Sequence, residues 1–365
     1  MKLSFDIFII LVRSTITGSF DELPSLLPLP ATIWKEVYQY SKENRLLGLT
    51  FDALRVLNKE ISNETGIETE LLMRWYGMSS LANKKYASTN FLSNEFAKEA
   101  RKAGLRCIVL KGQSVSCYYT NPIWRDSGDL DIYLGKDYER GNEFARSIGA
   151  EVDTGTYKHS HIHYKGLMIE NHRYLTEFGG TKNGKTLEKL LEFCIDREPL
   201  TQLELDNMYR PSAHFNALFL TKHSMVHFFS EGLPFRYIYD WAMFLKTEGN
   251  SIDWKQTYSE MEKCNLRNFA DVMIRICVEK LGLQLPNSSI TISSDGPLVK
   301  AFIDDLMIFN KGFSSNESNF EKVGRIFKRI YYRLWKFRKL NNESFVIAIW
   351  KLFAFNSYLH RKIEL

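Results

Sequence analysis

The sequence predicts an α+β fold, in which a small mixed β-sheet is flanked by helical N-terminal and C-terminal regions. Apolar residues recur every three to four positions over residues 1–95 and over most of residues 181–365, which is the period of helices with one buried face. Between these regions, short apolar and alternating runs bounded by glycines are typical of strands. We therefore divide the chain into a helical region (1–95), a mixed core (96–180) and a second helical region (181–365).

The composition is ordinary for a folded chain. Of 365 residues, 44 % are hydrophobic and 25 % are charged, and the formal net charge of +5 permits anionic partners without requiring them. None of the five cysteines falls in a CxxC pair, which argues against a disulfide framework or a zinc knuckle. The apolar run Ile7–Val12 is too short to span a bilayer. We expect a soluble, cytoplasmic protein with no transmembrane segment.

The elements of the mixed core follow from changes of period. A helix over Lys84–Ala103 ends where Gly104 provides a C-terminal stop. The pattern then predicts, in order, a buried strand, a short helix, a second strand and a helix that ends at Gly149: Arg106–Leu110, Gln113–Tyr119, Asp129–Leu134 and Lys136–Ile148.

A hairpin and a series of helices complete the prediction. Two strand-like runs, Thr156–Tyr164 and Leu167–Leu175, flank the step Lys165-Gly166 and predict the hairpin. Helical patterns dominate after it, over Thr186–Arg197, Ser212–Ser230, Phe235–Lys246, Ile252–Gly282, Pro297–Phe309 and Glu321–Phe353.

Asp129 and Asp131 form the most informative pair in the sequence. Side chains alternate between the two faces of a strand, so these carboxylates point the same way, roughly 6–7 Å apart. Two like charges held this close repel unless a cation lies between them. Hard ions such as Mg²⁺ prefer carboxylate oxygens and usually bring phosphate ligands with them. The pair indicates a metal-dependent site that handles phosphate, although such pairs also occur on solvent-facing strands where the carboxylates are simply hydrated.

A glycine turn lies upstream of this pair, between the first strand and the short helix. Gly112 would let a phosphate approach the backbone closely, while the Lys111 ammonium and the Ser114 hydroxyl could add hydrogen bonds. Glycine is also common in strand–helix turns for purely steric reasons.

The turn and the paired aspartates together resemble the nucleotidyltransferase superfamily whose archetype is DNA polymerase beta. The wider string, LKG followed by RDSGDLDIYL and then Ile169-Glu170-Asn171-His172, is closer still to an uncharacterised bacterial branch of that superfamily with LKG, RxSGDxD and ExH motifs. The resemblance covers roughly residues 95–180. This chain departs from the common pattern in having Gly112-Gln113 where Gly-Ser or Gly-Gly is usual.

The resemblance implies transfer of a nucleoside monophosphate from a nucleoside triphosphate, such as ATP, to a hydroxyl acceptor, with release of pyrophosphate. Asp129, Asp131 and Glu170 would bind two Mg²⁺ ions, and Glu170 would help to deprotonate or orient the acceptor. Lys111, Gly112 and Ser114 would contact the triphosphate. The acceptor stays open among a small molecule, a sugar, a protein and RNA.

Arg125 has two interpretations. Its planar guanidinium suits bidentate contact with the triphosphate, or it forms an ion pair with Asp126 or Asp129 that fixes the loop.

Two other functions also stay open. One is a non-catalytic nucleotide- or RNA-binding module on the same fold, which the intact carboxylates argue against. The other is a toxin-like enzyme that modifies tRNA or protein through Lys322–Leu340, a basic segment with interleaved aromatic residues that suits RNA or an anionic membrane. An amphipathic helix with its aromatic side chains packed inward explains the same segment, since charge runs are usually solvated faces.

The place of His159, His161 and His163 depends on the hairpin turn. If the loop has two residues, His161 faces Glu170, and the histidines share the carboxylate face and could contact substrate. If it has three, the parity flips and they leave the site. A transition-metal site is less expected here, because the adjacent carboxylates favour a hard ion.

Three further histidines receive structural interpretations. By the same two-residue loop, His159 faces His172, and we expect His172 to support the site rather than act in it. His223 and His227 are four residues apart and share a helix face, where packing is the simpler explanation than metal binding. The resembled bacterial branch carries a similar histidine helix, so the resemblance implies that this helix forms a wall near the nucleotide.

Overall fold

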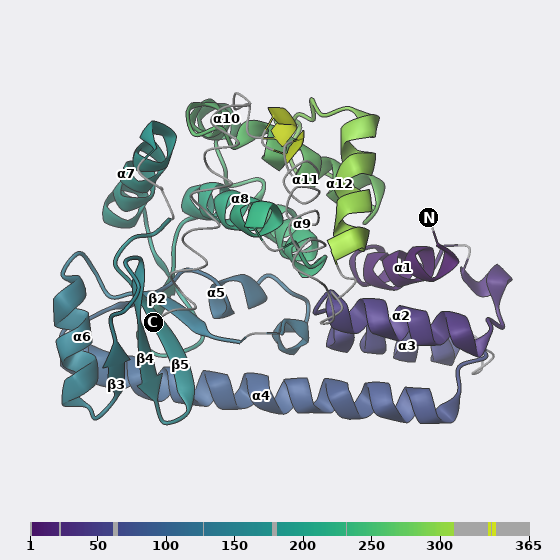
Figure 1. Ribbon diagram of the computed structural model, residues 1–365, viewed down its shortest axis with the longest axis horizontal. Coiled ribbons are helices and arrows are strands. Elements are labelled where there is room, and N and C mark those ends of the chain that lie inside the picture. Colours follow the sequence, from purple (N-terminus) through teal and green to yellow (C-terminus); the bar gives the residue numbers. More distant parts are fainter. Residues whose placement is uncertain are drawn as a thin grey trace, which may run out of the picture.

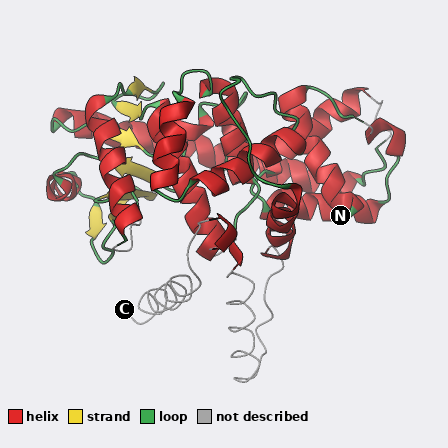
Figure 2. Cartoon of the chain, turned by 90° about the horizontal axis from the view of Figure 1, so that it is seen from above, coloured by secondary structure: helices red, strands yellow, loops and turns green. Residues whose placement is uncertain are grey.

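The computed structural model describes residues 2–21, 23–60, 65–126, 128–176, 181–230, 232–309, 335–336 and 338–340. It confirms the predicted α+β class, with a seven-stranded mixed sheet and helices on both sides of it along the chain (Figure 1). The strands gather at one end of the molecule, and helices build the remainder (Figure 2). Within the described residues, no helix combines the length and the apolar character needed to cross a membrane.

The sheet is made of short strands in the order β3-β4-β5-β2-β1-β7-β6. Their bounds are β1 Cys107–Val109, β2 Leu130–Tyr133, β3 Glu151–Asp153, β4 His159–Tyr164, β5 Leu167–His172, β6 Thr201–Gln202 and β7 Met208–Arg210. The pairs β2–β5 and β1–β7 are parallel, and the other neighbours are antiparallel. The predicted strand at Asp129 begins one residue later, so Asp129 precedes β2.

The hairpin β4–β5 has the two-residue loop that the sequence suggested. Lys165 and Gly166 have φ values of 50° and 86°, and positive φ at both central positions is the signature of a type I′ turn. The loop sets Tyr164 opposite Leu167 and, by the alternation of the ladder, His161 opposite Glu170. The register on which the histidine prediction depended is therefore confirmed.

Strands β6 and β7 lie between the predicted helices Thr186–Arg197 and Ser212–Ser230, where the sequence predicted no strand. They have two and three residues, which is too short for a period to be recognised. The β7 strand joins the sheet only because Cys107 and Ile108 of β1 pair with Met208 and Tyr209, a hundred residues away in the chain. The sheet thus takes strands from beyond residue 180.

The first helices carry the chain towards the sheet. Their bounds are α1 Leu3–Thr17, η1 Leu23–Leu26, α2 Ala31–Glu43, α3 Leu47–Glu60 and α4 Thr69–Lys102. The 34 residues of α4 span about 50 Å at 1.5 Å per residue. This helix runs beneath both α1–α3 and the sheet (Figure 1), and it ends before Gly104 as predicted.

The helices around and after the sheet supply its cover. Their bounds are α5 Gln113–Ser116, η2 Pro122–Trp124, α6 Tyr138–Ser147, α7 Lys182–Arg197, α8 Ala213–Ser230, α9 Arg236–Glu248, α10 Trp254–Lys263, α11 Arg267–Glu279 and α12 Gly296–Phe309.

One helix predicted over Ile252–Gly282 is in fact two, α10 and α11. Asn265 has a left-handed φ of 56°. The amide of Leu266 donates to the carbonyl of Met261, and the amide of Asn265 donates to that of Glu262. This is a Schellman motif with asparagine in place of the usual glycine. The sequence prediction was wrong here because an asparagine within an apolar period gives a weak stop signal.

The two faces of the sheet differ in chemistry. Leu130, Ile132 and Ile169 belong to a buried apolar cluster that includes Phe96 of α4 and Phe144 of α6. Since alternate residues of a strand face opposite ways, Asp131 and Glu170 lie on the other face. That polar face is turned towards the C-terminal helices.

The N-terminal and C-terminal helices share one hydrophobic core. The ring of Phe235, at the start of α9, lies 6.5 Å from that of Phe5 and 5.8 Å from that of Phe8, in edge-to-face arrangements. Helices from both ends of the described chain therefore position the wall that covers the polar face.

The basic segment Lys322–Leu340 lies largely outside the described residues. Of its described part, Trp335 lies 6.2 Å from Phe228 between ring centroids, and the Lys336 ammonium is buried. That ammonium donates to the Phe228 carbonyl and lies 2.5 Å from Asp305. These two residues thus serve packing.

A buried ion pair fastens the loop before β2 to helix α9. Arg125 donates from Nε and Nη2 to the two carboxylate oxygens of Asp240, at 2.8 and 2.9 Å, and the Tyr119 hydroxyl adds a hydrogen bond of 2.6 Å. Both charged side chains are about 95 % buried. Burial would raise the pKa of Asp240, but Arg125 and Arg236 outweigh it and hold that pKa below its usual value.

Replacing Arg125 should destabilise the protein strongly. Arg125→Met leaves the Asp240 carboxylate buried and uncompensated, and we expect a loss of about 3–5 kcal/mol in the free energy of unfolding. Urea unfolding followed by tryptophan fluorescence measures it. The matched control is Arg101→Met, which breaks an exposed pair with Asp206 and should cost less than about 1 kcal/mol. Equal losses in the two variants would contradict the assignment.

A partly buried cluster joins α7, α8 and α10 through His214. Its Nδ1 lies 2.7 Å from Glu198 and its Nε2 lies 2.6 Å from Glu260. Carboxylates only accept, so both ring nitrogens carry protons. Burial works against this charge, but the contacts with Cys194 and Glu198 outweigh it and raise the pKa of His214 to about 11.

The His214 cluster should make stability depend on pH. A raised folded pKa gives a contribution that is full below the unfolded value of about 6.5 and is lost as the pH rises towards the folded value. The difference in unfolding free energy between wild type and His214→Gln should therefore shrink steadily from about pH 6 to about pH 10. Urea titrations over this range test it, with His163→Gln, at an exposed site, as the control. A pH-independent difference would refute it.

Candidate active site

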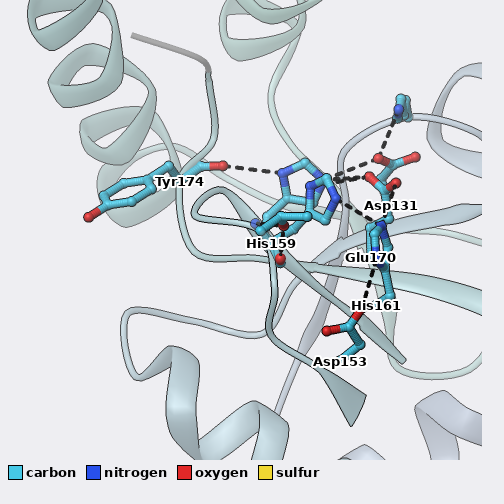
Figure 3. Close-up of polar contacts among 9 residues, drawn as sticks. Asp131, Asp153, His159, His161, Glu170 and Tyr174 are labelled. Atoms are coloured by element: carbon cyan, nitrogen blue, oxygen red, sulfur yellow. Dashed lines mark hydrogen bonds and ion pairs between the residues drawn. The ribbon is translucent and has the colours of Figure 1, made fainter. Parts of the chain in front are cut away.

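The polar face of the sheet carries a row of ionisable side chains at one level. The cross-strand register places Asp131 of β2 beside Glu170 of β5, Glu170 beside His161 of β4, and His161 beside Asp153 of β3. Residues paired in this way lie about 5 Å apart and share a face. The strands themselves therefore assemble the site, and Figure 3 shows these side chains converging.

Asp131 lies at the centre and is completely buried. Its Oδ1 accepts from the Lys111 ammonium at 2.9 Å and lies 3.1 Å from Nε2 of His172. Burial alone would raise the pKa of Asp131, but the two nitrogen partners outweigh it and hold that pKa well below its usual range. The carboxylate is therefore ionised, while its Oδ2 has no hydrogen-bond partner among the described residues.

The charge of Asp131 acts to raise the pKa of both other carboxylates, but their net pKa shifts are opposite. Burial works against ionisation of Glu170, but the hydrogen bond with His172 outweighs it and lowers the pKa. Burial and the negative charge of Asp131 raise the pKa of Asp129. The site thus holds more negative charge than Lys111 compensates, which together with the unpartnered Asp131 oxygen fits a bound cation. Asp131, Glu170 and His172 offer ligand atoms that all lie within 4.8 Å of one another, and carboxylate oxygens suit a hard divalent ion.

His172 contacts two of the carboxylates, Asp131 and Glu170. Its Nδ1 lies 3.2 Å from the Tyr174 carbonyl, which can only accept, so Nδ1 carries a proton and the ring orientation is fixed. Nε2 then faces Asp131 at 3.1 Å and Glu170 at 3.5 Å. His172 is 1 % exposed, in agreement with the supporting role expected of it.

The glycine turn brings Lys111 to the carboxylates. Gly112 follows it with φ 68° and ψ −113°, and positive φ is readily adopted only by glycine. A Cβ atom at Gly112 would lie 3.7 Å from the Asp129 carbonyl, an ordinary contact. Glycine is therefore required here by the backbone and not by crowding. Burial disfavours the charge on Lys111, but Asp131, Asp129 and Glu170 outweigh it and raise its pKa.

Two residues expected to contact the triphosphate have other surroundings in the structure, although Arg125 lines the same cavity as Asp129 and Asp131. Ser114 is completely buried, and its hydroxyl has no hydrogen-bond partner among the described residues. Arg125 was expected either at the triphosphate or paired with Asp126 or Asp129, whereas its guanidinium lies in bidentate contact with Asp240. Helix α5 after the turn is only four residues long.

A cavity of about 130 Å³ adjoins the carboxylates, and its far wall comes from α8 and α9. The histidines that were expected to form a wall do line it: the rings of His223 and His227 lie 4.5 Å apart and each packs against Tyr237. Burial holds the pKa of His223 well below its usual value. The packing interpretation of this pair agrees with these contacts.

Sequence reasoning missed the cationic side of this cavity. Arg45, from the turn between α2 and α3, and Arg236, at the start of α9, both line it. Arg236 also donates to the backbone carbonyl of Asp126. No local signal in the sequence could place these arginines, because they reach the site only through the packing of distant helices.

Neighbouring carboxylates on a mixed sheet beside a Lys-Gly turn are the arrangement expected of a nucleotidyl-transferring enzyme. Comparison with models of protein families matches residues 30–282, more than half of the chain, to the family described as "Uncharacterised nucleotidyltransferase". The chain belongs to this family and is a transferase, as the sequence resemblance implied. A search of curated proteins and a search of solved structures gave no match.

The backbone at Gly112 provides a test of the turn. Gly112→Ala should lower the free energy of unfolding by about 1–3 kcal/mol, because alanine is strained at positive φ. Gly128→Ala is the matched control, since it borders the same cavity and a Cβ there meets nothing within 4 Å. Urea unfolding measures both. Equal stability of the two variants would show that the turn does not need glycine.

Proposed function

We propose that the protein transfers a nucleoside monophosphate from a nucleoside triphosphate to a hydroxyl acceptor, with release of pyrophosphate and dependence on Mg²⁺. The observation that carries this proposal is the pairing of Asp131 with Glu170 on adjacent strands, with Asp129 two residues before Asp131. The family match supports nucleotidyl transfer in general.

Asp129, Asp131 and Glu170 are the residues proposed to hold two Mg²⁺ ions. When bound, such ions neutralise phosphate charge and stabilise the attacking and leaving oxygens of an in-line displacement. The unpartnered oxygen of Asp131 and the raised pKa of Asp129 support this assignment. Glu170 is proposed to orient the acceptor hydroxyl or receive its proton.

The cavity suggests how a nucleotide would lie. Its volume of about 130 Å³ is below the roughly 300–1,000 Å³ of common ligand pockets. We infer that the phosphate chain enters beside Lys111 and Gly112, while the nucleoside stays outside the cavity. Arg45 and Arg236 supply positive charge on the opposite wall, where it would attract the outer phosphates.

Loss of the paired aspartates should abolish transfer. Purified protein is incubated with each α-labelled nucleoside triphosphate, Mg²⁺, and separate protein, RNA and small-molecule fractions of a cell extract. Changing an outer-shell partner of a metal commonly costs 10–100-fold, and loss of direct ligands should cost at least as much. We therefore expect Asp129→Asn/Asp131→Asn to lower label transfer by at least about 100-fold.

The control is Asp126→Asn, which removes an exposed carboxylate from the same loop and should transfer label at the wild-type rate. Equal transfer by the double variant would reject the catalytic assignment. Binding of labelled nucleotide without transfer to any fraction would favour a non-catalytic nucleotide-binding module. The fraction that receives the label identifies the class of acceptor.

A further inference from the structure

A second group of metal-binding side chains adjoins the three carboxylates on the same sheet face. His159 and His161 of β4 and Glu170 of β5 offer ligand atoms that all lie within 4.8 Å of one another. The two-residue hairpin loop creates this group, because it sets His161 directly opposite Glu170. Figure 3 shows both imidazoles beside that carboxylate.

The distances in this group suit a tetrahedral ion. Nε2 of His159 lies 3.2 Å from Nε2 of His161, and the latter lies 3.8 Å from Oε1 of Glu170. With zinc–nitrogen bonds of 2.0–2.1 Å, two ligands on a tetrahedral ion lie about 3.3 Å apart. The two imidazoles are therefore already spaced as neighbouring ligands of one ion.

The surroundings also match a metal site. A ligating imidazole usually has a carboxylate or carbonyl behind its second nitrogen, and Oδ2 of Asp153 lies 4.0 Å from Nδ1 of His161. Nδ1 of His159 makes no hydrogen bond with the described residues and lies 3.5 Å from Oε2 of Glu170.

We propose that His159, His161 and Glu170 bind a transition-metal ion of the zinc class, with Asp153 orienting His161. Imidazole nitrogen favours such ions over Mg²⁺, so this site differs in selectivity from the carboxylates of Asp129 and Asp131. Glu170 is shared, because its Oε1 lies 3.8 Å from Nε2 of His161 while its Oε2 lies 3.5 Å from both Nδ1 of His159 and Nε2 of His172. An ion bound to the histidines would hold Glu170 in the orientation seen here.

The proposal is tested with the full-length protein, stripped with a chelator and titrated with Zn²⁺ and with Co²⁺, whose visible absorption reports tetrahedral geometry. Bound metal is counted by mass spectrometry after gel filtration. We expect one tight ion per chain, a loss of at least about 100-fold in affinity for His159→Gln/His161→Gln, and a loss of about 10–100-fold for Asp153→Asn.

Two controls separate this site from others. His163→Gln changes an exposed histidine on the same strand and should bind as wild type does. Cys194→Ser removes a ligand from another group able to hold an ion, formed with Glu198 and His214. If Cys194→Ser retains the Co²⁺ spectrum, the proposal is supported. If Cys194→Ser loses the spectrum, the ion lies in the Cys194 group and the proposal is overturned.

A third variant separates metal binding at the histidines from the transfer reaction. Asp129→Asn/Asp131→Asn should retain the Co²⁺ spectrum even though label transfer fails. Loss of the spectrum in that variant, or wild-type affinity in His159→Gln/His161→Gln, would overturn the proposal. Circular dichroism checks the fold of each variant, and the single change His161→Gln, at a partly exposed ring, provides a milder version that should also weaken binding.

Discussion

The buried carboxylate of Asp131 is the constraint around which the structure is arranged. An ionised group with no exposed surface is tolerated only if partners replace its hydration. Lys111 and His172 do so, and each arrives from a different neighbouring strand or its following turn. The turn at Gly112 brings Lys111 to this carboxylate, and the hairpin brings His172 to it. Even so, Oδ2 of Asp131 has no hydrogen-bond partner among the described residues. A cation bound at this oxygen would supply the missing partner.

The helices keep Asp131 buried by covering the polar face of the sheet. Helix α9 is fixed to the loop before β2 by the Arg125–Asp240 pair, and its start packs against α1 through Phe235. Helices far apart in sequence therefore determine the width of the cavity. A buried ion pair adds little net stability to a protein, although removing one partner lowers the stability strongly. The Arg125–Asp240 contact therefore fixes the position of α9 more than it stabilises the fold.

Features set by local rules could be predicted from the sequence, and features set by distant packing could not. The α+β class and the existence of the hairpin follow from strand alternation and from the Lys165-Gly166 step, whereas the sequence left the loop open between two and three residues and the structure decides for two. The partner of Arg125 could not be found, because Asp240 lies 115 residues away. Strands β6 and β7 were missed for a similar reason, as their pairing with β1 creates them. The break at Asn265 depends on a single left-handed residue inside a helical period.

Glu170 links the two proposed metal sites. Its Oε1 lies near His161, and its Oε2 lies 3.5 Å both from His159 and from His172, which contacts Asp131. A ligand shared between two sites couples their affinities, and thermodynamic linkage requires the coupling to be equal in both directions. An ion at the histidines that withdraws charge from Glu170 weakens its attraction for a hard ion, whereas the same ion, by fixing the carboxylate, lowers the entropy cost of binding there. The sign of the coupling therefore reports which of these two effects is larger in this protein.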